Sequence, residues 1–200
     1  MNSRGRIIVW TLLCATAVFA LSAIGFQVGK MRRSPLPEFK PVPDFQLLER
    51  RGKTVSLADL KGKVWLADFI YTTCPGPCPM LTSRLADLQK EALQNPAVRF
   101  VSVSTNPAND TPEVLQNYAE RFHASSQWLF LTGEKSKVYD LIQNGFSLAV
   151  AEMPDEKNPV VHSTKIVLVD KKGMIRKYYD GVETSPSSEI LSDLARLTKE

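Results

Sequence analysis

The sequence has no acidic residue in its first 33 positions and almost no net charge in the remainder. Residues 1–33 hold five of the 25 basic residues, and removing them leaves 20 basic against 21 acidic residues. The formal charge of +4 therefore belongs to the N-terminal segment. Because nucleic acids are bound through clustered Lys and Arg side chains, this balance argues against nucleic-acid binding by the rest of the chain.

Internal repeats and low-complexity tracts are also absent, and groups suited to metal or thiol chemistry are few. The chain has three cysteines and two histidines in 200 residues. Its apolar fraction of 44% and charged fraction of 23% are those of a folded protein, which excludes disorder as the default. This length accommodates one globular domain and a short appendage.

An uncharged apolar run occupies residues 7–26. Twenty residues at a rise of about 1.5 Å match the roughly 30 Å hydrocarbon core of a bilayer. A cleaved signal peptide with a small-residue site near Ala20 is the alternative, but the apolar region of a signal peptide usually runs only about 7–15 residues. The run therefore favours an uncleaved anchor, in which Cys14 is an ordinary residue of the membrane helix and not a lipid-modified cysteine.

The chain is divided accordingly into four predicted parts. Residues 1–6 are a cytoplasmic stub, 7–29 a transmembrane helix, 30–43 a stiff proline-rich linker and 44–200 the folded domain. Basic residues flank both ends of the anchor, so the positive-inside rule separates the two orientations poorly. A six-residue stub is easily retained, and we expect the folded domain on the extracytoplasmic side.

The folded domain alternates strand and helix patterns. Strands are predicted at residues 45–48, 54–56, 64–71, 98–104, 128–131, 163–169 and 174–179. Helices are predicted at residues 79–94, from Pro112 after an N-cap at Thr111, at 135–143 and at 187–197. This order predicts an α/β fold with a mixed sheet flanked by helices, as in thioredoxin, with extra material between Lys135 and Val161.

Cys74 and Cys78 are the only cysteines of the predicted domain and lie in the segment TCPGPCP, between a buried strand and a helix. Partial positive charge at a helix N-terminus lowers the pKa of a thiol, so we expect the thiolate to be favoured here. The i, i+4 spacing places both sulfurs on one face of a helical turn. Three prolines restrict the backbone, which predicts a preorganised pair.

Three interpretations of this pair compete. A structural disulfide would close a very short loop and therefore stabilise little. A redox dithiol is consistent with the pair, although the usual oxidoreductase spacing is one residue shorter. Two thiolates at this spacing also suit a soft ion such as Cu(I), whereas a closed structural zinc site takes four protein ligands.

His162 is the third candidate ligand. It comes just before the predicted strand 163–169, in a loop that a thioredoxin fold brings beside the cysteine pair. A neutral imidazole there would complete a Cys2His set, which suits both Cu(I) and Cu(II). A surface or capping histidine is the alternative, and that role is assigned to His123, at the predicted C-terminus of a helix.

Asp68 places a carboxylate in the buried strand 64–71, where a charge is costly unless it is paired or neutralised. Burial should raise the pKa of this group and fit it to accept a proton during thiol chemistry. The alternative is a structural ion pair with Lys61 or Lys63.

These motifs resemble the Sco/SenC family, the copper proteins of cytochrome c oxidase assembly. The resemblance covers nearly the whole predicted domain, and its most specific parts are FIYTTCPGPCP at 69–79, DTPE at 110–113, and His162-Ser163 followed by VLVD at 167–170. It implies a thioredoxin fold that binds one copper ion through Cys74, Cys78 and His162. It also implies delivery of copper to the CuA centre of the oxidase, or reduction of that centre's cysteines.

The resemblance further implies partners and a location. The expected partners are the oxidase subunit that carries CuA, a periplasmic copper donor or thiol reductant, and the membrane. Since the segment before the anchor leaves no room for a mitochondrial presequence, we expect a single-pass protein of a bacterial plasma membrane, with its domain on the periplasmic side.

Four other residues bear on the expected site. Asn106 and Val161 stand where many family members have an acidic residue, which puts in doubt a role for nearby acids in docking or in tuning the metal. Met80 and Met153 carry thioethers that copper can bind, but core or loop positions are the commoner role of methionine.

Two further function classes stay open. A thiol–disulfide oxidoreductase would need Cys74 and Cys78 but not His162. A thioredoxin-like peroxidase would need one highly reactive thiolate with proton donors beside it, whereas Trp65 and Trp128 are interpreted as core residues.

Overall fold

A computed structural model describes residues 15, 16, 18–22, 35–153, 160–182 and 186–200. The chain divides into two compact units, Met1–Leu36 and Pro37–Glu200. In the first unit, residues 15, 16 and 18–22 are helical. Across the described residues, no helix combines the length and the apolar character needed to cross a bilayer. Most of the anchor predicted at residues 7–29 lies outside the described residues.

The second unit is built on a seven-stranded sheet with the strand order β2-β1-β5-β4-β3-β8-β9. Its strands are β1 (Gln46–Glu49), β2 (Thr54–Ser56), β3 (Val64–Ile70), β4 (Val98–Ser104), β5 (Trp128–Thr132), β8 (Lys165–Val169) and β9 (Ile175–Asp180). The three inner strands β3, β4 and β5 run parallel, and the pairs towards both edges are antiparallel. The predicted mixed sheet is therefore confirmed, and each of its strands lies within two residues of its predicted bounds.

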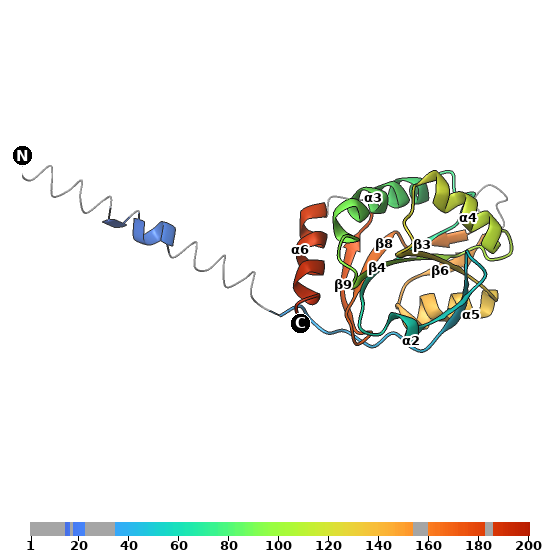
Figure 1. The fold of residues 1–200 in the computed structure, drawn as a ribbon, viewed down its shortest axis with the longest axis horizontal. Coiled ribbons are helices and arrows are strands. Elements are labelled where there is room, and N and C mark those ends of the chain that lie inside the picture. The colour runs from blue at the N-terminus through green and yellow to red at the C-terminus, as the bar shows by residue number, and fades with distance from the viewer. Residues whose placement is uncertain (1–14, 17, 23–34, 154–159, 183–185) are drawn as a thin grey trace, which may run out of the picture. The chain divides into compact units, whose positions relative to one another are not determined.

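Helices flank this sheet on both faces. They are α2 (Leu57–Leu60), α3 (Pro77–Ala92), α4 (Pro112–Arg121), α5 (Lys135–Asp140) and α6 (Ser187–Leu197), and a π-helical turn, η1 (Leu141–Gly145), continues α5. Figure 1 shows α3 and α4 over one face and α2 and α5 on the opposite side. Thr111 accepts a hydrogen bond from the Val114 amide at the start of α4, as its predicted N-cap role requires. This arrangement is the predicted thioredoxin-like fold.

β3 is the centre of the core, since all seven of its residues are buried. β3 has a parallel neighbour, β4, on one side and an antiparallel neighbour, β8, on the other. Because helices also cover both faces of the sheet, its side chains are expected to be apolar, and only Asp68 is not. On one face, Trp65 and Phe69 pack edge-on against Phe146, at ring-centroid distances of 6.0 and 5.1 Å. The core thus includes both β3 and Phe146, the residue that follows η1.

A second, two-stranded sheet stands apart from the first. It pairs β6 (Val150–Glu152) with β7 (Val160–His162), in the segment where only extra material was predicted. Strands of three residues carry little periodicity of their own, because alternation needs about four positions to stand out. A short turn marks β1 and β2 as a hairpin, whereas seven residues separate β6 from β7. The position of His162 in a loop was therefore predicted wrongly: it is the last residue of β7, where it pairs with Val150.

The N-terminal residues of the second unit are hydrogen-bonded to the β8–β9 turn. The amide of Phe39 donates to Ile175 O and the amide of Val42 donates to Gly173 O, each over 2.9 Å, while Pro41 bridges Met174. Val42 is buried, and Lys40 Nζ reaches the carbonyl of Asn144 in η1. Although they fall in the predicted linker at 30–43, residues 37–42 belong to the folded unit.

Candidate metal and dithiol site

The cysteine turn joins the end of β3 to the start of α3. The Cys74 amide donates to Tyr71 O over 3.2 Å, and α3 begins at Pro77, so that Cys78 is its second residue. Both thiols are free and buried, and Cys78 has no exposed surface. The Cys74 side chain lies near enough to Cys78 to raise the pKa of its thiol. The turn therefore holds two adjacent reduced sulfurs.

His162 reaches this pair from β7. Its Nε2 lies 3.3 Å from Cys78 Sγ, and its ring stands edge-on to the Tyr71 ring, with centroids 5.6 Å apart and planes at 83°. The structure thus brings the predicted imidazole to Cys78, one of the two predicted thiols. Tyr71, which was not singled out from the sequence, packs directly against it.

The proton on the imidazole can be placed from its two contacts. Nδ1 lies 3.0 Å from Ser163 O, and a carbonyl only accepts hydrogen bonds, so Nδ1 carries the proton. Burial lowers the pKa of His162, which favours the neutral ring, and the other nitrogen then bears a lone pair. Nε2 therefore accepts a hydrogen bond from the Cys78 thiol, and it is the nitrogen available to a metal ion.

Burial shifts the pKa of the Cys78 thiol in the direction opposite to that expected from its position at a helix N-terminus. Desolvation raises the pKa of Cys78 well above the ordinary range of a thiol, and the neighbouring Cys74 side chain raises it further. A hydrogen bond from the Tyr71 backbone opposes this shift but is the smaller effect. The expectation of a lowered thiol pKa is therefore wrong for Cys78, because loss of water outweighs the partial charge of the helix N-terminus.

Asp68 lies beneath the site on the α3 and α4 side of the sheet. Its Oδ1 accepts a hydrogen bond of 2.5 Å from Ser102 Oγ, which in turn accepts one of 2.9 Å from Trp128 Nε1. Its Oδ2 is buried without a hydrogen-bond partner. Burial raises the pKa of Asp68 to about 7, and its charge acts on both Cys78 and Tyr118. The hydrogen bonds identify Ser102, not Lys61 or Lys63, as the partner of Asp68.

A second buried polar pair adjoins Cys78 and was missed in the sequence. Thr82 Oγ1 donates to Cys78 O, and Tyr118 OH donates to Thr82 Oγ1, each over 2.9 Å. Burial raises the pKa of Tyr118, so the phenol stays neutral. The available signal was a hydroxyl at a core-facing position of a helix, between Leu81 and Leu85.

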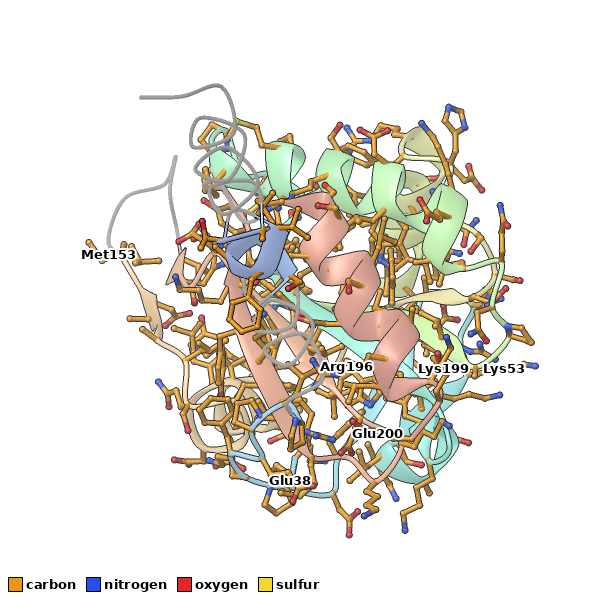
Figure 2. All side chains as sticks on the ribbon, turned by 90° about the vertical axis from the view of Figure 1, so that its left-hand side faces the viewer. Glu38, Lys53, Met153, Arg196, Lys199 and Glu200 are labelled. Atoms are coloured by element: carbon orange, nitrogen blue, oxygen red, sulfur yellow. The ribbon has the colours of Figure 1, made fainter. Side chains whose placement is uncertain are left out.

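The remaining candidates lie apart from the thiols or at the surface. His123 has a φ of 52° and its amide donates to Glu120 O, so it closes α4 through its backbone in a left-handed conformation. Met80 and Met153 are 55% and 47% exposed, and Figure 2 shows Met153 at the edge of the domain. Neither methionine is a core residue.

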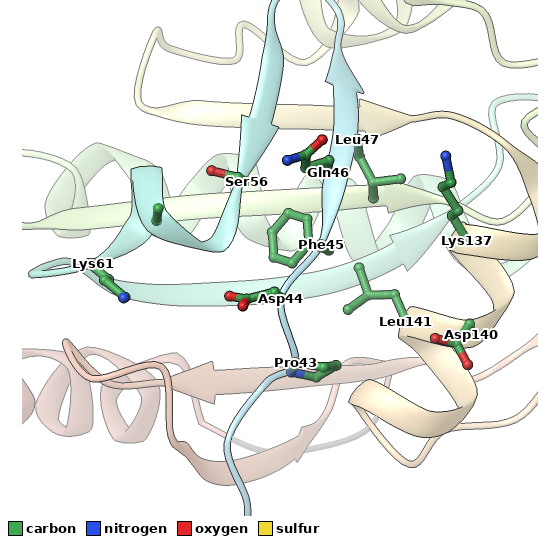
Figure 3. Close-up of a pocket in the computed structure, with 11 residues that line it drawn as sticks. Pro43, Asp44, Phe45, Gln46, Leu47, Ser56, Lys61, Lys137, Asp140 and Leu141 are labelled. Atoms are coloured by element: carbon green, nitrogen blue, oxygen red, sulfur yellow. The ribbon is translucent and has the colours of Figure 1, made fainter.

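No ready-made metal cage surrounds Cys78. Within the part of the chain that the structure describes, no three His, Cys, Asp or Glu side chains are grouped to hold a metal ion. A pocket of about 620 Å³ lies elsewhere, lined by residues in and beside β1, α2 and α5 that include Phe45, Lys61 and Lys137 (Figure 3). Because no cysteine or histidine lines it, this pocket offers no soft ligand.

Comparison with known proteins gives consistent matches over the folded unit. The SCO1/SenC family matches residues 34–199. The chain is 39% identical over 170 residues to a SCO1 protein homolog of Bacillus subtilis (strain 168), which covers 83% of this chain and 86% of the relative.

Two solved structures extend the comparison. BsSco, described as a member of the Sco family of cytochrome c oxidase assembly proteins with a disulfide switch, has a TM-score of 0.73 and 35% identity, covering 82% of this chain and 98% of that one. ScoI of Bradyrhizobium japonicum with copper bound has a TM-score of 0.69 and 25% identity, covering 79% and 99%. With the family match spanning most of its length, this chain belongs to the SCO1/SenC family.

Proposed function

We propose that this chain is a membrane-anchored copper metallochaperone that binds one copper ion through Cys74, Cys78 and His162. It delivers that ion to the CuA centre of cytochrome c oxidase, or prepares the thiols of that centre to receive it. The observation that carries the proposal is the approach of His162 Nε2 to within 3.3 Å of Cys78 Sγ. Support also comes from the copper held by the ScoI relative and from the assembly role named for BsSco.

The spacing of donor atoms supports a metal ion between them. If the bond lengths are like those of zinc, about 2.3 Å to sulfur and 2.05 Å to nitrogen, and the angles are about 109–120°, the two donors would stand roughly 3.5–3.8 Å apart. The observed 3.3 Å therefore needs to widen by only a few tenths of an ångström. In that movement a metal ion takes the place of the thiol proton.

The residues around the donors have defined tasks. The carbonyl of Ser163 keeps the proton on Nδ1, so that Nε2 stays free to bind, and Tyr71 limits rotation of the ring. Two sulfurs and one nitrogen make a soft donor set that suits copper in both oxidation states. Because each thiol must lose its proton on binding, copper uptake releases protons and is weakened by acid.

A titration of the full-length protein in detergent with Cu(II) tests this proposal. We expect one copper ion per chain, a sulfur-to-copper charge-transfer band, and both sulfur and nitrogen scattering in X-ray absorption. His162→Ala should lose the nitrogen contribution and bind at least tenfold more weakly, while His123→Ala is the matched control and should leave both signals unchanged. Unaltered copper affinity in His162→Ala would count against the proposed ligand set.

The anchor and location form a separate part of the proposal. The uncharged run at residues 7–26 is the support for a single-pass helix in a bacterial plasma membrane, with the domain on the periplasmic side. The partners on that side are the oxidase subunit that carries CuA and a copper donor or thiol reductant. Two experiments test this topology. The chain should stay in the membrane fraction after carbonate extraction. In intact cells a protease should cleave the domain only after the outer membrane or cell wall has been opened.

A thiol–disulfide oxidoreductase is the second candidate function. It is favoured by the two free, buried cysteines, whose side chains interact closely enough for Cys74 to raise the pKa of Cys78, and by the disulfide switch named for BsSco. In this role Asp68 is proposed to accept a proton from the thiols. Oxidase assembly in cells that carry His162→Ala separates the two functions: full assembly would favour thiol chemistry, and failed assembly with an intact disulfide couple would favour copper delivery.

A further inference from the structure

We infer that Asp110 is a positioning residue that fixes the cysteine turn, acting through Thr72. This inference deepens the proposed function, because it concerns the geometry of the same site. Asp110 has no exposed surface and lies in the turn between β4 and α4, 32 positions after Cys78 in the chain. Nothing in the charge or periodicity of the sequence connects it to the cysteines.

The carboxylate of Asp110 gathers hydrogen bonds from three segments. Thr72 donates to it twice, from its amide over 3.1 Å and from its Oγ1 over 2.6 Å. Ser104, the last residue of β4, donates from its Oγ over 2.6 Å, and Asn109 donates from its side-chain amide over 2.8 Å. Hydroxyl donors at 2.6 Å are typical of charge-assisted hydrogen bonds to an ionised carboxylate.

These contacts fasten the first residues of the cysteine turn to the end of the neighbouring strand. Thr72 is two residues before Cys74, and the carbonyl of Ile70, two residues before Thr72, accepts from the amide of Thr105 over 2.7 Å. The chain entering the turn is thus held on one side by a backbone bond and on the other by Asp110. From Thr73 to Cys78 the turn contains two prolines and one glycine, so its path depends on how its entrance is held.

Helix capping does not account for this arrangement. The N-cap of α4 is Thr111, whose Oγ1 accepts the Val114 amide. Asp110 precedes the cap, and its oxygens are directed to Thr72 and Ser104 instead of the first amides of α4. A buried carboxylate costs free energy unless it is fully hydrogen-bonded, so its presence here indicates a task at the junction of β3, β4 and the cysteine turn.

Three variants of the full-length protein in detergent test the inference. Asp110→Asn removes the charge, Thr72→Val removes one donor on the turn side, and Thr111→Ala is the matched control that weakens the α4 cap without touching Thr72. Two readouts are compared: the equilibrium of the copper-free Cys74–Cys78 couple with glutathione, and the charge-transfer band after Cu(II) is added. Unfolding by urea gives the stability of each variant.

We expect Asp110→Asn and Thr72→Val to change the equilibrium constant with glutathione at least tenfold in the same direction, which is about 30 mV for a two-electron couple. Both should also shift the charge-transfer band. Thr111→Ala should lower stability and leave both readouts at the wild-type values. An unchanged equilibrium constant in Asp110→Asn, or an equal change in Thr111→Ala, overturns the inference.

The outcomes separate this inference from the proposed function. If the wild-type protein takes up no copper, the metallochaperone proposal fails, and the glutathione equilibrium still decides the role of Asp110. If Asp110→Asn does not fold, Thr72→Val decides alone, because it keeps the carboxylate and the amide donor of residue 72. A Thr72→Val variant with wild-type values would then overturn the inference.

Discussion

The imidazole of His162 and the thiol of Cys78 meet across 84 positions of sequence, with Nε2 3.3 Å from Sγ. The ring is neutral and its Nδ1 proton is held by Ser163 O, so the thiol donates to the ring. The proposed nitrogen ligand and one of the two proposed sulfur ligands therefore share one hydrogen bond.

Cys78 should react slowly with alkylating agents at neutral pH. Because burial raises its pKa, the thiolate that attacks iodoacetamide is scarce, and its fraction grows only in strongly alkaline solution. In a Cys74→Ser background, mass spectrometry should find Cys78 modified at least tenfold more slowly at pH 7 than after unfolding in urea. Equal rates in the folded and unfolded protein would show that burial does not protect the thiol.

Asp68 should make the free energy of unfolding fall as pH rises. Its pKa is about 7 in the folded state against an ordinary value of 3.8, so between roughly pH 4 and pH 7 the folded state binds more protons than the unfolded state. The stability that comes from the neutral carboxyl is present below pH 4 and is lost as pH rises through 7, with an upper limit of about 4 kcal/mol.

Asp68→Asn isolates this contribution from that of other groups. The amide cannot ionise, so urea unfolding should show a flatter dependence on pH in the variant and the largest gain over wild type above pH 7. Asp59→Asn, which alters an exposed carboxylate in the capping box of α2, is the control. Parallel pH profiles for wild type and Asp68→Asn would contradict the raised pKa.

Removing the hydroxyl of Thr82 should cost more stability than removing that of Tyr118. Thr82→Val leaves the buried phenol of Tyr118 without its partner and removes the side-chain bond to Cys78 O, at a cost of about 1–3 kcal/mol. Tyr118→Phe leaves Thr82 still bonded to Cys78 O, and about 1 kcal/mol is expected. Thermal unfolding of the two variants and of the double variant measures the difference, and the reverse order would refute this account of the pair.

Replacing His123 by glycine should stabilise the protein by up to about 1 kcal/mol. The residue has a φ of 52°, a conformation that glycine adopts without the steric cost carried by other L-residues. Its ring lies at an exposed position, so nothing in the core is lost. Denaturant unfolding checks the gain, and copper uptake by the same variant should equal that of the wild type. A loss of stability would mean that the His123 side chain stabilises the folded protein by more than its left-handed backbone conformation costs.

Elements with strong local signals could be predicted closely from the sequence. The alternation at Val98–Ser104 and the amphipathic pattern at Ser187–Leu197 predicted the bounds of β4 and α6, and Thr111 before Pro112 predicted the start of α4. In each of these, the residues that set the structure are neighbours in the chain. The motif around Cys74 and Cys78, which resembles that of the Sco/SenC family, likewise identified the turn that carries the two thiols.

Features that depend on distant residues could not be predicted in this way. The β6–β7 sheet owes its existence to the pairing of two three-residue strands, and it decides where His162 stands. The raised pKa of Cys78 depends on how completely the fold excludes water from one sulfur, which no spacing reveals. Asp110 bonds to Thr72 only because β4 ends beside β3.

The hydrogen bonds of residues 37–42 set the length of any tether between the domain and a membrane. Six extended residues would lengthen a free linker by roughly 20 Å, but here the backbone of Phe39 and Val42 is fixed to the β8–β9 turn. Any further length in such a linker must therefore come from residues before Pro37. In the proposed membrane-anchored protein, the reach of the domain from the bilayer would be shorter by that amount, and the proposed acceptor would have to present its site correspondingly near the bilayer.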